Sequence, residues 1–190
     1  MFLSYFVDLL NQEWRRAMST LATFNGVDTS RIAALSNKIQ EEPAQGDTLW
    51  KAEVIWQNGF RNQIRIRDLP ASYADEPEVL GGTNTAPNPV EQLLGALGSC
   101  LAIGYTANAS VRGIQIEELR IELEGHIDLP VFLGLHEGHA GYSDVAIKVY
   151  LKADAPQQTL EELHQQVLKT SPVGQTIEKA IPLHATLVHT

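Results

Sequence analysis

The segment that most constrains the fold is residues 89–111, PVEQLLGALGSCLAIGYTANASV, which is apolar on almost every side. Asn88 followed by Pro89 predicts where a helix begins, because asparagine caps helix N-termini and proline is favoured in the first helical position. Gly113 predicts where the helix ends. A helix that is apolar all round is buried all round. Its interior glycines cost helix stability, which predicts the close approach of another backbone.

A hairpin and a long loop are predicted before this helix. Apolar and polar residues alternate on both sides of Asn58-Gly59, so residues 49–67 are interpreted as two antiparallel strands joined by a tight turn. Prolines and a glycine pair punctuate residues 70–88, which predicts a loop. A loop this long in a compact domain usually serves a function. The acidic residues of this loop, Asp75, Glu76 and Glu78, are expected to be solvated.

After the central helix, alternation and capping residues predict an α+β arrangement. We expect strands at 115–125 and 143–152 and a helix at 160–169. A short helix that starts at Ser171 and a closing strand at 184–189 are expected to follow. Thr159 and Glu162 are interpreted as a capping box for the helix at 160–169. Between the first two strands, residues 128–142 form an apolar loop.

The N-terminal part is interpreted as an arm. Residues 1–17 have the spacing of an amphipathic helix and lack the pattern of a secretory signal, and Met18 is an equally good start of the chain. Asp28-Thr29 predicts the cap of a helix that reaches Gln40, followed by a linker. We therefore expect a helical arm and linker over 1–47 and one domain over 48–190.

Charge and cysteine content exclude several classes of function. The net charge of −9 and the pI near 5.1 argue against a nucleic-acid partner, because phosphates would be repelled. No membrane partner is expected either, because an acidic surface gives no help in binding anionic lipid. The chain has 1 cysteine, which excludes an internal disulfide and fits a reducing cytoplasm. Any thiol chemistry must therefore use Cys100.

Two segments resemble the signatures of the OsmC/Ohr family. DEPEVLGGTNTAPNPVEQLLGALGSCL has the family's Gly-, Asn- and Pro-rich loop followed by a helix in which the cysteine comes eleven residues after a proline, as Cys100 follows Pro89. TSPVGQTI resembles the second motif, in which Ser171 takes the place of a cysteine. The resemblance covers roughly residues 48–190. It implies an intertwined α+β homodimer whose antiparallel sheets wrap around the buried central helix.

The resemblance also implies a site and an activity. In the family, an organic hydroperoxide oxidises the helix cysteine to a sulfenic acid, a second cysteine closes a disulfide, and a small dithiol reduces it. An arginine on an early hairpin strand and a glutamate near the helix start complete the site. By this correspondence the catalytic candidates are Cys100, Arg61 and Ser171. Val90 stands where the glutamate belongs, and Glu91 lies on the helix face opposite Cys100 at ~100° per residue.

These observations predict a cytoplasmic, homodimeric, thiol-dependent peroxidase-like protein. Its partners are expected to be a second copy of the chain, an organic hydroperoxide and a small thiol or dithiol. The alternative is a non-enzymatic binding or interaction module in which Cys100 is inert. Arg65 and Arg67 are the next candidates for the cation. No cofactor or metal is expected, because the histidine pair in HEGH at 136–139 lies in a Gly-rich loop without a third ligand.

Overall fold

The computed structural model describes residues 23–179 and 181–188. The chain divides into two compact units, the first formed by Met1–Thr29 with Leu97–Thr190 and the second by Ser30–Ala96. None of the helices in the described ranges is long and apolar enough to cross a membrane. The helix predicted at 1–17 and the choice of Met18 as a start lie outside the described residues.

The first unit is built on a two-stranded antiparallel sheet. Strand β4 (Ile116–Ile127) pairs with β5 (Tyr142–Ala153), and both strands alternate between half-buried and exposed positions. The half-buried positions carry the apolar side chains, so one face of the sheet is apolar. The two predicted strands are confirmed. Strand β4 begins one residue later and ends two residues later than predicted, and β5 extends one residue beyond each predicted end.

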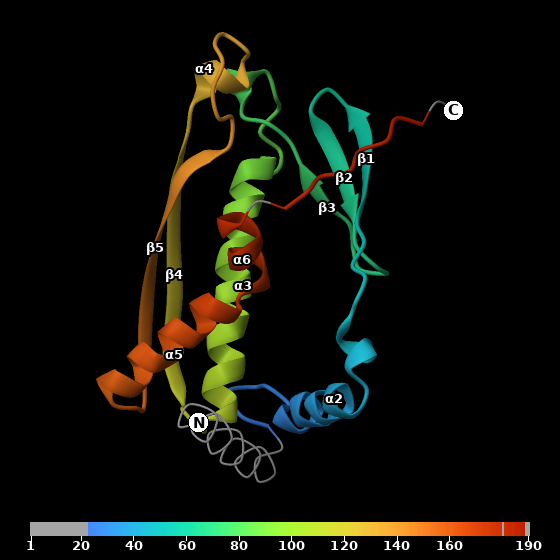
Figure 1. Ribbon diagram of the computed structural model, residues 1–190. Coiled ribbons are helices and arrows are strands. Elements are labelled where there is room, and N and C mark those ends of the chain that lie inside the picture. The colour runs from blue at the N-terminus through green and yellow to red at the C-terminus, as the bar shows by residue number, and fades with distance from the viewer. Residues whose placement is uncertain (1–22, 180, 189–190) are drawn as a thin grey trace. The chain divides into compact units, whose positions relative to one another are not determined.

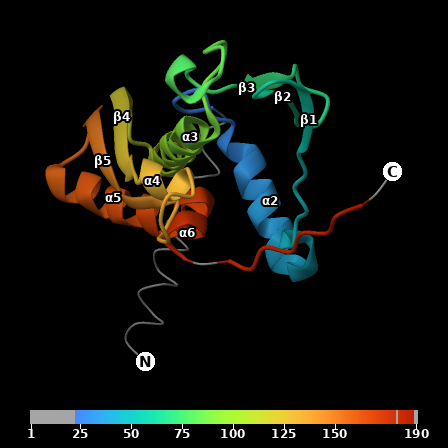
Figure 2. The ribbon, with the colours of Figure 1, turned by 90° about the horizontal axis from the view of Figure 1, so that it is seen from above.

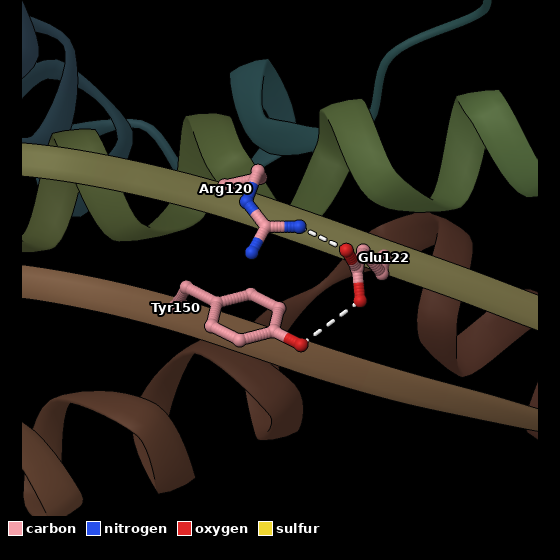
Figure 3. Close-up of polar contacts among 3 residues, drawn as sticks. All are labelled: Arg120, Glu122 and Tyr150. Carbon is pink, nitrogen blue, oxygen red and sulfur yellow. Dashed lines mark hydrogen bonds and ion pairs between the residues drawn. The ribbon is translucent and has the colours of Figure 1, made fainter.

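The opposite face of this sheet carries charged and polar side chains (Figure 3). Arg120 forms an ion pair with Glu122 and lies 3.8 Å above the centre of the Tyr150 ring. The Tyr150 hydroxyl donates a 2.9 Å hydrogen bond to Glu122. The hydrogen bond from Tyr150 is the main reason why the pKa of Glu122 lies below its ordinary value, and the contact with Arg120 lowers it further. Exposed ion pairs of this kind contribute little to stability, so this face is a solvated surface.

Helix α3 (Pro89–Val111) has the predicted ends. At its start Asn88 and Glu91 form a capping box: the Glu91 N–H donates to Asn88 Oδ1 and the Asn88 N–H donates to Glu91 Oε2, each at 2.9 Å. At its end Gly113 has a φ of 69°, and the Ile114 N–H donates to the Ala109 carbonyl at 2.9 Å. Glycine adopts this left-handed conformation without strain, so the helix stops there.

The core of the first unit lies where α3 and α5 (Gln157–Thr170) pack on the apolar face of β4 and β5, and Figures 1 and 2 both show α3 beside these strands. Its buried members are Leu97, Leu101, Tyr105, Ala109, Ile114, Leu163 and Val167. The interior glycines explain how closely the layers approach. A Cβ at Gly98 would lie 2.7 Å from Leu123, and one at Gly104 would lie 3.0 Å from Val167. The close approach is confirmed, but the neighbours are side chains and not another backbone.

A buried tyrosine connects α3 to α5. Tyr105 is 0% exposed, and its hydroxyl is hydrogen-bonded to Nδ1 of His164. Burial, assisted by the negative charge of Glu161, raises the pKa of Tyr105 to about 12. The folded state therefore favours the neutral phenol. The stability that this contributes is fully present below the unfolded pKa of about 10 and is lost as the pH rises through about 12.

We therefore expect alkaline pH to destabilise the wild type more than Tyr105→Phe, which has no phenol to ionise. Between about pH 9 and about pH 11.5, the free energy of unfolding of the wild type should fall by about 2 kcal/mol more than that of the variant. Urea unfolding followed by circular dichroism at both pH values measures this difference. Equal losses in the two proteins would contradict the assignment.

A tight turn near the N-terminus is fixed to the end of α3. Asn25 has a φ of 47° and lies between Phe24 and Val27, whose backbones pair with each other. The Asn25 Nδ2 donates to the Ile114 carbonyl at 2.9 Å, and its Oδ1 accepts from the Ile116 N–H at 3.0 Å. One side chain thus satisfies backbone groups in the connection between α3 and β4.

Asn25→Gly should lower the free energy of unfolding by about 2 kcal/mol, because glycine keeps the positive φ but leaves these backbone groups without partners. Asn84→Gly is the matched control. Asn84 also has a positive φ, of 51°, but its side chain is exposed. Denaturant unfolding of both variants isolates the contribution of the Asn25 amide. Equal destabilisation of the two would show that the amide contributes nothing.

The second unit contains the predicted hairpin. Strands β1 (Glu53–Asn58) and β2 (Arg61–Arg65) are antiparallel and joined at Gly59, whose φ is 55°. The other elements of this unit are α2 (Thr29–Glu41), η1 (Pro43–Gly46), β3 (Ser72–Ala74) and η2 (Glu78–Leu80). Helix α2 is confirmed. The segment 70–88 is more structured than predicted, because β3 pairs with β2 as a third strand.

Three details after α3 differ from the sequence predictions. Helix α5 begins at Gln157, after Pro156, so Thr159 is inside the helix and caps nothing. The loop between β4 and β5 contains a short helix, α4 (Leu129–Phe132), which Asp128 caps. Residues 184–188 form no strand, since β4 and β5 pair only with each other in the described part of the chain.

Candidate active site

The thiol of Cys100 lies against the hydroxyl of Ser171. Cys100 is half-buried in the middle of α3 and carries a free thiol. Its Sγ lies 3.3 Å from Oγ of Ser171, which is 71 positions away in the sequence. The structure thus brings together two of the three catalytic candidates, both within the first unit.

Ser171 is held in place by the start of α6 (Pro172–Glu178). Its side chain is the N-cap of this helix and accepts a 3.1 Å hydrogen bond from the Gly174 N–H, as the sequence predicts. A Cβ at position 174 would lie only 3.1 Å from Ser171 Oγ, so glycine permits this approach. Ser171 is 4% exposed, and burial restricts its hydroxyl to the partners beside it.

The contacts of Ser171 determine the direction of its hydrogen bond with the Cys100 sulfur. Ser171 Oγ already accepts from the Gly174 N–H, and its single proton remains to be donated. A thiolate can only accept hydrogen bonds, so Ser171 is the donor whenever Cys100 is ionised. Hydrogen bonding to the charged form favours that form. The pair can therefore stabilise a negative sulfur or an oxygen attached to it.

Arg61 belongs to the second unit, where it lies at the start of β2. Its Nη1 donates a 2.6 Å hydrogen bond to Oγ1 of Thr85, and its guanidinium lies 4.4 Å above the centre of the Tyr73 ring. Within the described ranges, no carboxylate forms an ion pair with it. Arg65, by contrast, lies 3.6 Å from the carboxylate of Glu53. The role of Arg61 toward Cys100 stays a prediction.

Sequence reasoning missed a buried carboxylate that shares the hydroxyl of Thr85 with Arg61. Asp75, expected to be solvated, is 1% exposed. It accepts hydrogen bonds from the hydroxyls of Thr83 and Thr85 and from backbone N–H groups, among them those of Glu76 at 2.9 Å and Thr85 at 3.1 Å. The Thr83 hydroxyl and the Thr85 N–H contribute most to holding the pKa of Asp75 well below its usual range. The Thr-x-Thr pattern after the glycine pair was the available signal.

Glu91 and the two histidines of the HEGH segment at 136–139 have other surroundings. The carboxylate of Glu91 accepts from the Asn88 N–H in the capping box of α3. His136 lies 4.0 Å from Asp128, in the connection between β4 and β5. Among the residues that the structure describes, no three histidine, cysteine or carboxylate side chains are grouped so as to hold a metal ion.

The fold and the site define a small α+β protein with a helix-borne thiol. The family model of OsmC-like proteins matches residues 82–186, more than half of the chain. The chain therefore belongs to the OsmC-like family, and the matched segment includes both Cys100 and Ser171. No curated protein matches the sequence.

Solved structures of this family share the fold. An OsmC-like protein from Mycoplasma pneumoniae is 18% identical, with 75% of this chain and 99% of that chain covered and a TM-score of 0.60. An OsmC-like protein of unknown function from Vibrio cholerae is 14% identical, with coverages of 70% and 95% and a TM-score of 0.55. An organic hydroperoxide resistance protein OsmC from Legionella pneumophila is 19% identical, with coverages of 68% and 89% and a TM-score of 0.53. The α+β fold class is confirmed.

Proposed function

We propose that this chain is a thiol-dependent peroxidase that reduces organic hydroperoxides through Cys100 alone. The observation that carries the proposal is the 3.3 Å contact between the Cys100 sulfur and the buried Ser171 hydroxyl. It gives the only cysteine a fixed hydrogen-bond partner in a fold whose relatives include an organic hydroperoxide resistance protein. A cysteine that only filled space would need no such partner.

The first step is an attack of the Cys100 thiolate on the outer oxygen of the hydroperoxide. A sulfur–oxygen bond forms, the oxygen–oxygen bond breaks, and the alkoxide leaves and takes up a proton to become the alcohol. The sulfur is oxidised to a sulfenic acid while the hydroperoxide is reduced. Ser171 donates a hydrogen bond to the thiolate, and we assign the stabilising positive charge to Arg61.

The second step needs thiols from outside the chain, because Ser171 cannot form a disulfide. One small thiol condenses with the sulfenic acid, which forms a mixed disulfide and releases water. A second thiol, or the other end of a dithiol, attacks this disulfide and returns Cys100 to its reduced form. The external thiols are oxidised to a disulfide. Such a cycle fits a reducing compartment, and we propose the cytoplasm.

We further propose that the working form is a homodimer. Helix α3 is apolar on almost every side, yet Ile103 in its middle is 69% exposed in the single chain. A partner subunit is the natural cover for this face. Sedimentation velocity at micromolar concentration should give a dimer, with an interface well above ~2,000 Å² in a crystal structure. A stable monomer at that concentration would contradict the proposal.

Turnover is the test of the activity. With cumene hydroperoxide as the oxidant and dithiothreitol as the reductant, the chain should consume hydroperoxide at least about 100-fold faster than the same concentration of free cysteine. Loss of hydroperoxide is followed by a colorimetric iron assay. Consumption no faster than that by free cysteine favours the alternative function, a binding or interaction module with an inert thiol.

A further inference from the structure

Arg61 is oriented by a neutral hydroxyl. The Thr85 Oγ1 accepts its 2.6 Å hydrogen bond, and the Tyr73 ring supports the guanidinium from one side at 4.4 Å. A guanidinium has five N–H donors, and Thr85 uses only one of them. The remaining donors stay available for an anion, which a bidentate carboxylate partner would have prevented.

Asp75 determines which way the Thr85 hydroxyl points. Oδ2 of Asp75 lies 2.9 Å from Oγ1 of Thr85, and an ionised carboxylate only accepts hydrogen bonds. The single hydroxyl proton of Thr85 therefore points at Asp75. The lone pairs of the same oxygen are left for Arg61, so the chain of contacts runs in one direction from the guanidinium to the carboxylate.

The loop that carries Thr85 is itself fixed by Asp75. Oδ2 also accepts from the backbone N–H groups of Thr83 and Thr85, at 3.2 and 3.1 Å. The backbone of Gly82 packs so tightly on Glu76 that a Cβ there would lie 1.9 Å from the Glu76 carbonyl oxygen. The position of the hydroxyl is thus set by backbone contacts, as a residue that orients another side chain requires.

We propose that Thr85 is a positioning residue for Arg61, oriented in turn by Asp75. It fixes the direction of the guanidinium without neutralising it by direct contact, so that Arg61 is preorganised for a negatively charged sulfur or oxygen. This inference rests on the proposed function, since it assumes that Arg61 serves Cys100. It assigns a role to Thr85 and Asp75, which both lie in the second unit. The sequence alone predicts only that residues 70–88 form a long loop.

The test compares three threonine variants for the rate of Cys100 oxidation by cumene hydroperoxide. Thr85→Val keeps the shape and removes the hydroxyl, and should slow oxidation about tenfold. Thr85→Ser restores the hydroxyl and should return the rate to within about threefold of the wild type. Thr48→Val is the matched control, because Thr48 is also an exposed threonine of the second unit whose hydroxyl accepts from a side-chain nitrogen, in this case that of Trp50 at 2.9 Å. It should stay within about threefold of the wild type.

Arg61→Ala separates positioning from general damage. This variant should slow oxidation on the order of 100-fold, and adding Thr85→Val to it should change the rate no further. Melting temperatures confirm that each variant is folded. If Arg61→Ala slows the reaction but Thr85→Val does not, the inference is wrong and the proposed function stands. Equal effects of Thr85→Val and Thr48→Val, or additive effects of Thr85→Val and Arg61→Ala, also overturn it. A wild type no faster than free cysteine overturns both.

Discussion

Cys100→Ser is expected to abolish reduction of organic hydroperoxides completely. The chain has 1 cysteine, so no other sulfur can accept the peroxide oxygen, and a serine hydroxyl is far too weak a nucleophile to replace it. Serine at position 100 keeps a polar side chain at hydrogen-bond distance from Ser171, so the fold should survive. Hydroperoxide consumption in the turnover assay measures the loss.

A second variant, Ser171→Ala, keeps the thiol and removes its hydrogen-bond donor. We expect about a tenfold slower reaction, because a hydrogen bond to a charged group contributes about 1.5 kcal/mol. The same substitution removes the N-cap of α6 and should cost about 1 kcal/mol of stability. Activity that persists in Cys100→Ser would show that the chemistry does not use the thiol at all.

Ser171→Cys should convert the one-cysteine site into one that closes an internal disulfide. The side-chain atoms at positions 100 and 171 are already 3.3 Å apart, and a disulfide needs sulfur atoms at about 2.05 Å, a small further approach. After one equivalent of cumene hydroperoxide, the sulfenic acid at Cys100 should be attacked by the new thiol and release water. Thiol titration should then show both thiols lost together.

The crosslink should also be visible in stability and on gels. In the chain-entropy model, a disulfide that closes a loop of this length stabilises the fold by about 4 kcal/mol, so the oxidised variant should melt well above its reduced form. The oxidised chain should run as a monomer on a non-reducing denaturing gel. Crosslinked dimers, or one thiol that persists beside an oxidised one, would show that the two side chains do not face each other in solution.

The sequence predicted the elements whose signals are local. Asn88, Pro89 and Gly113 marked both ends of α3, and alternation marked β4 and β5 to within a few residues. The turn at Asn58-Gly59 did the same for β1 and β2. In each case the residues that specify the backbone conformation lie within the element itself, so no tertiary information was needed.

The errors arose where local signals competed or partners were distant. Thr159 and Glu162 have the spacing of a capping box, but the N-cap of α5 is Pro156, three residues before Thr159. Residues 184–188 alternate like a strand, although a strand needs a neighbour to pair with. Asp75 resembled a solvated acid because its hydroxyl partners lie up to ten residues away.

The candidate site was predictable only in part. The Cys100–Ser171 contact followed from the resemblance of two separate motifs, and the structure places those side chains together. Ser171 as an N-cap followed from the proline after it. The contact of Thr85 with Arg61 was not predictable, because the two residues are 24 positions apart in the sequence and only the folded loop brings them together.

The central claim, that Cys100 is a peroxidatic thiol, is tested most directly by a single-turnover measurement. The reduced chain is mixed with one equivalent of cumene hydroperoxide in the presence of dimedone, and the intact mass and the loss of free thiol are followed with time. We predict stoichiometric trapping of a sulfenic acid on Cys100, at a rate at least about 100-fold above that of free cysteine. A thiol that reacts no faster than free cysteine, or a dimedone adduct that never forms, would contradict the account.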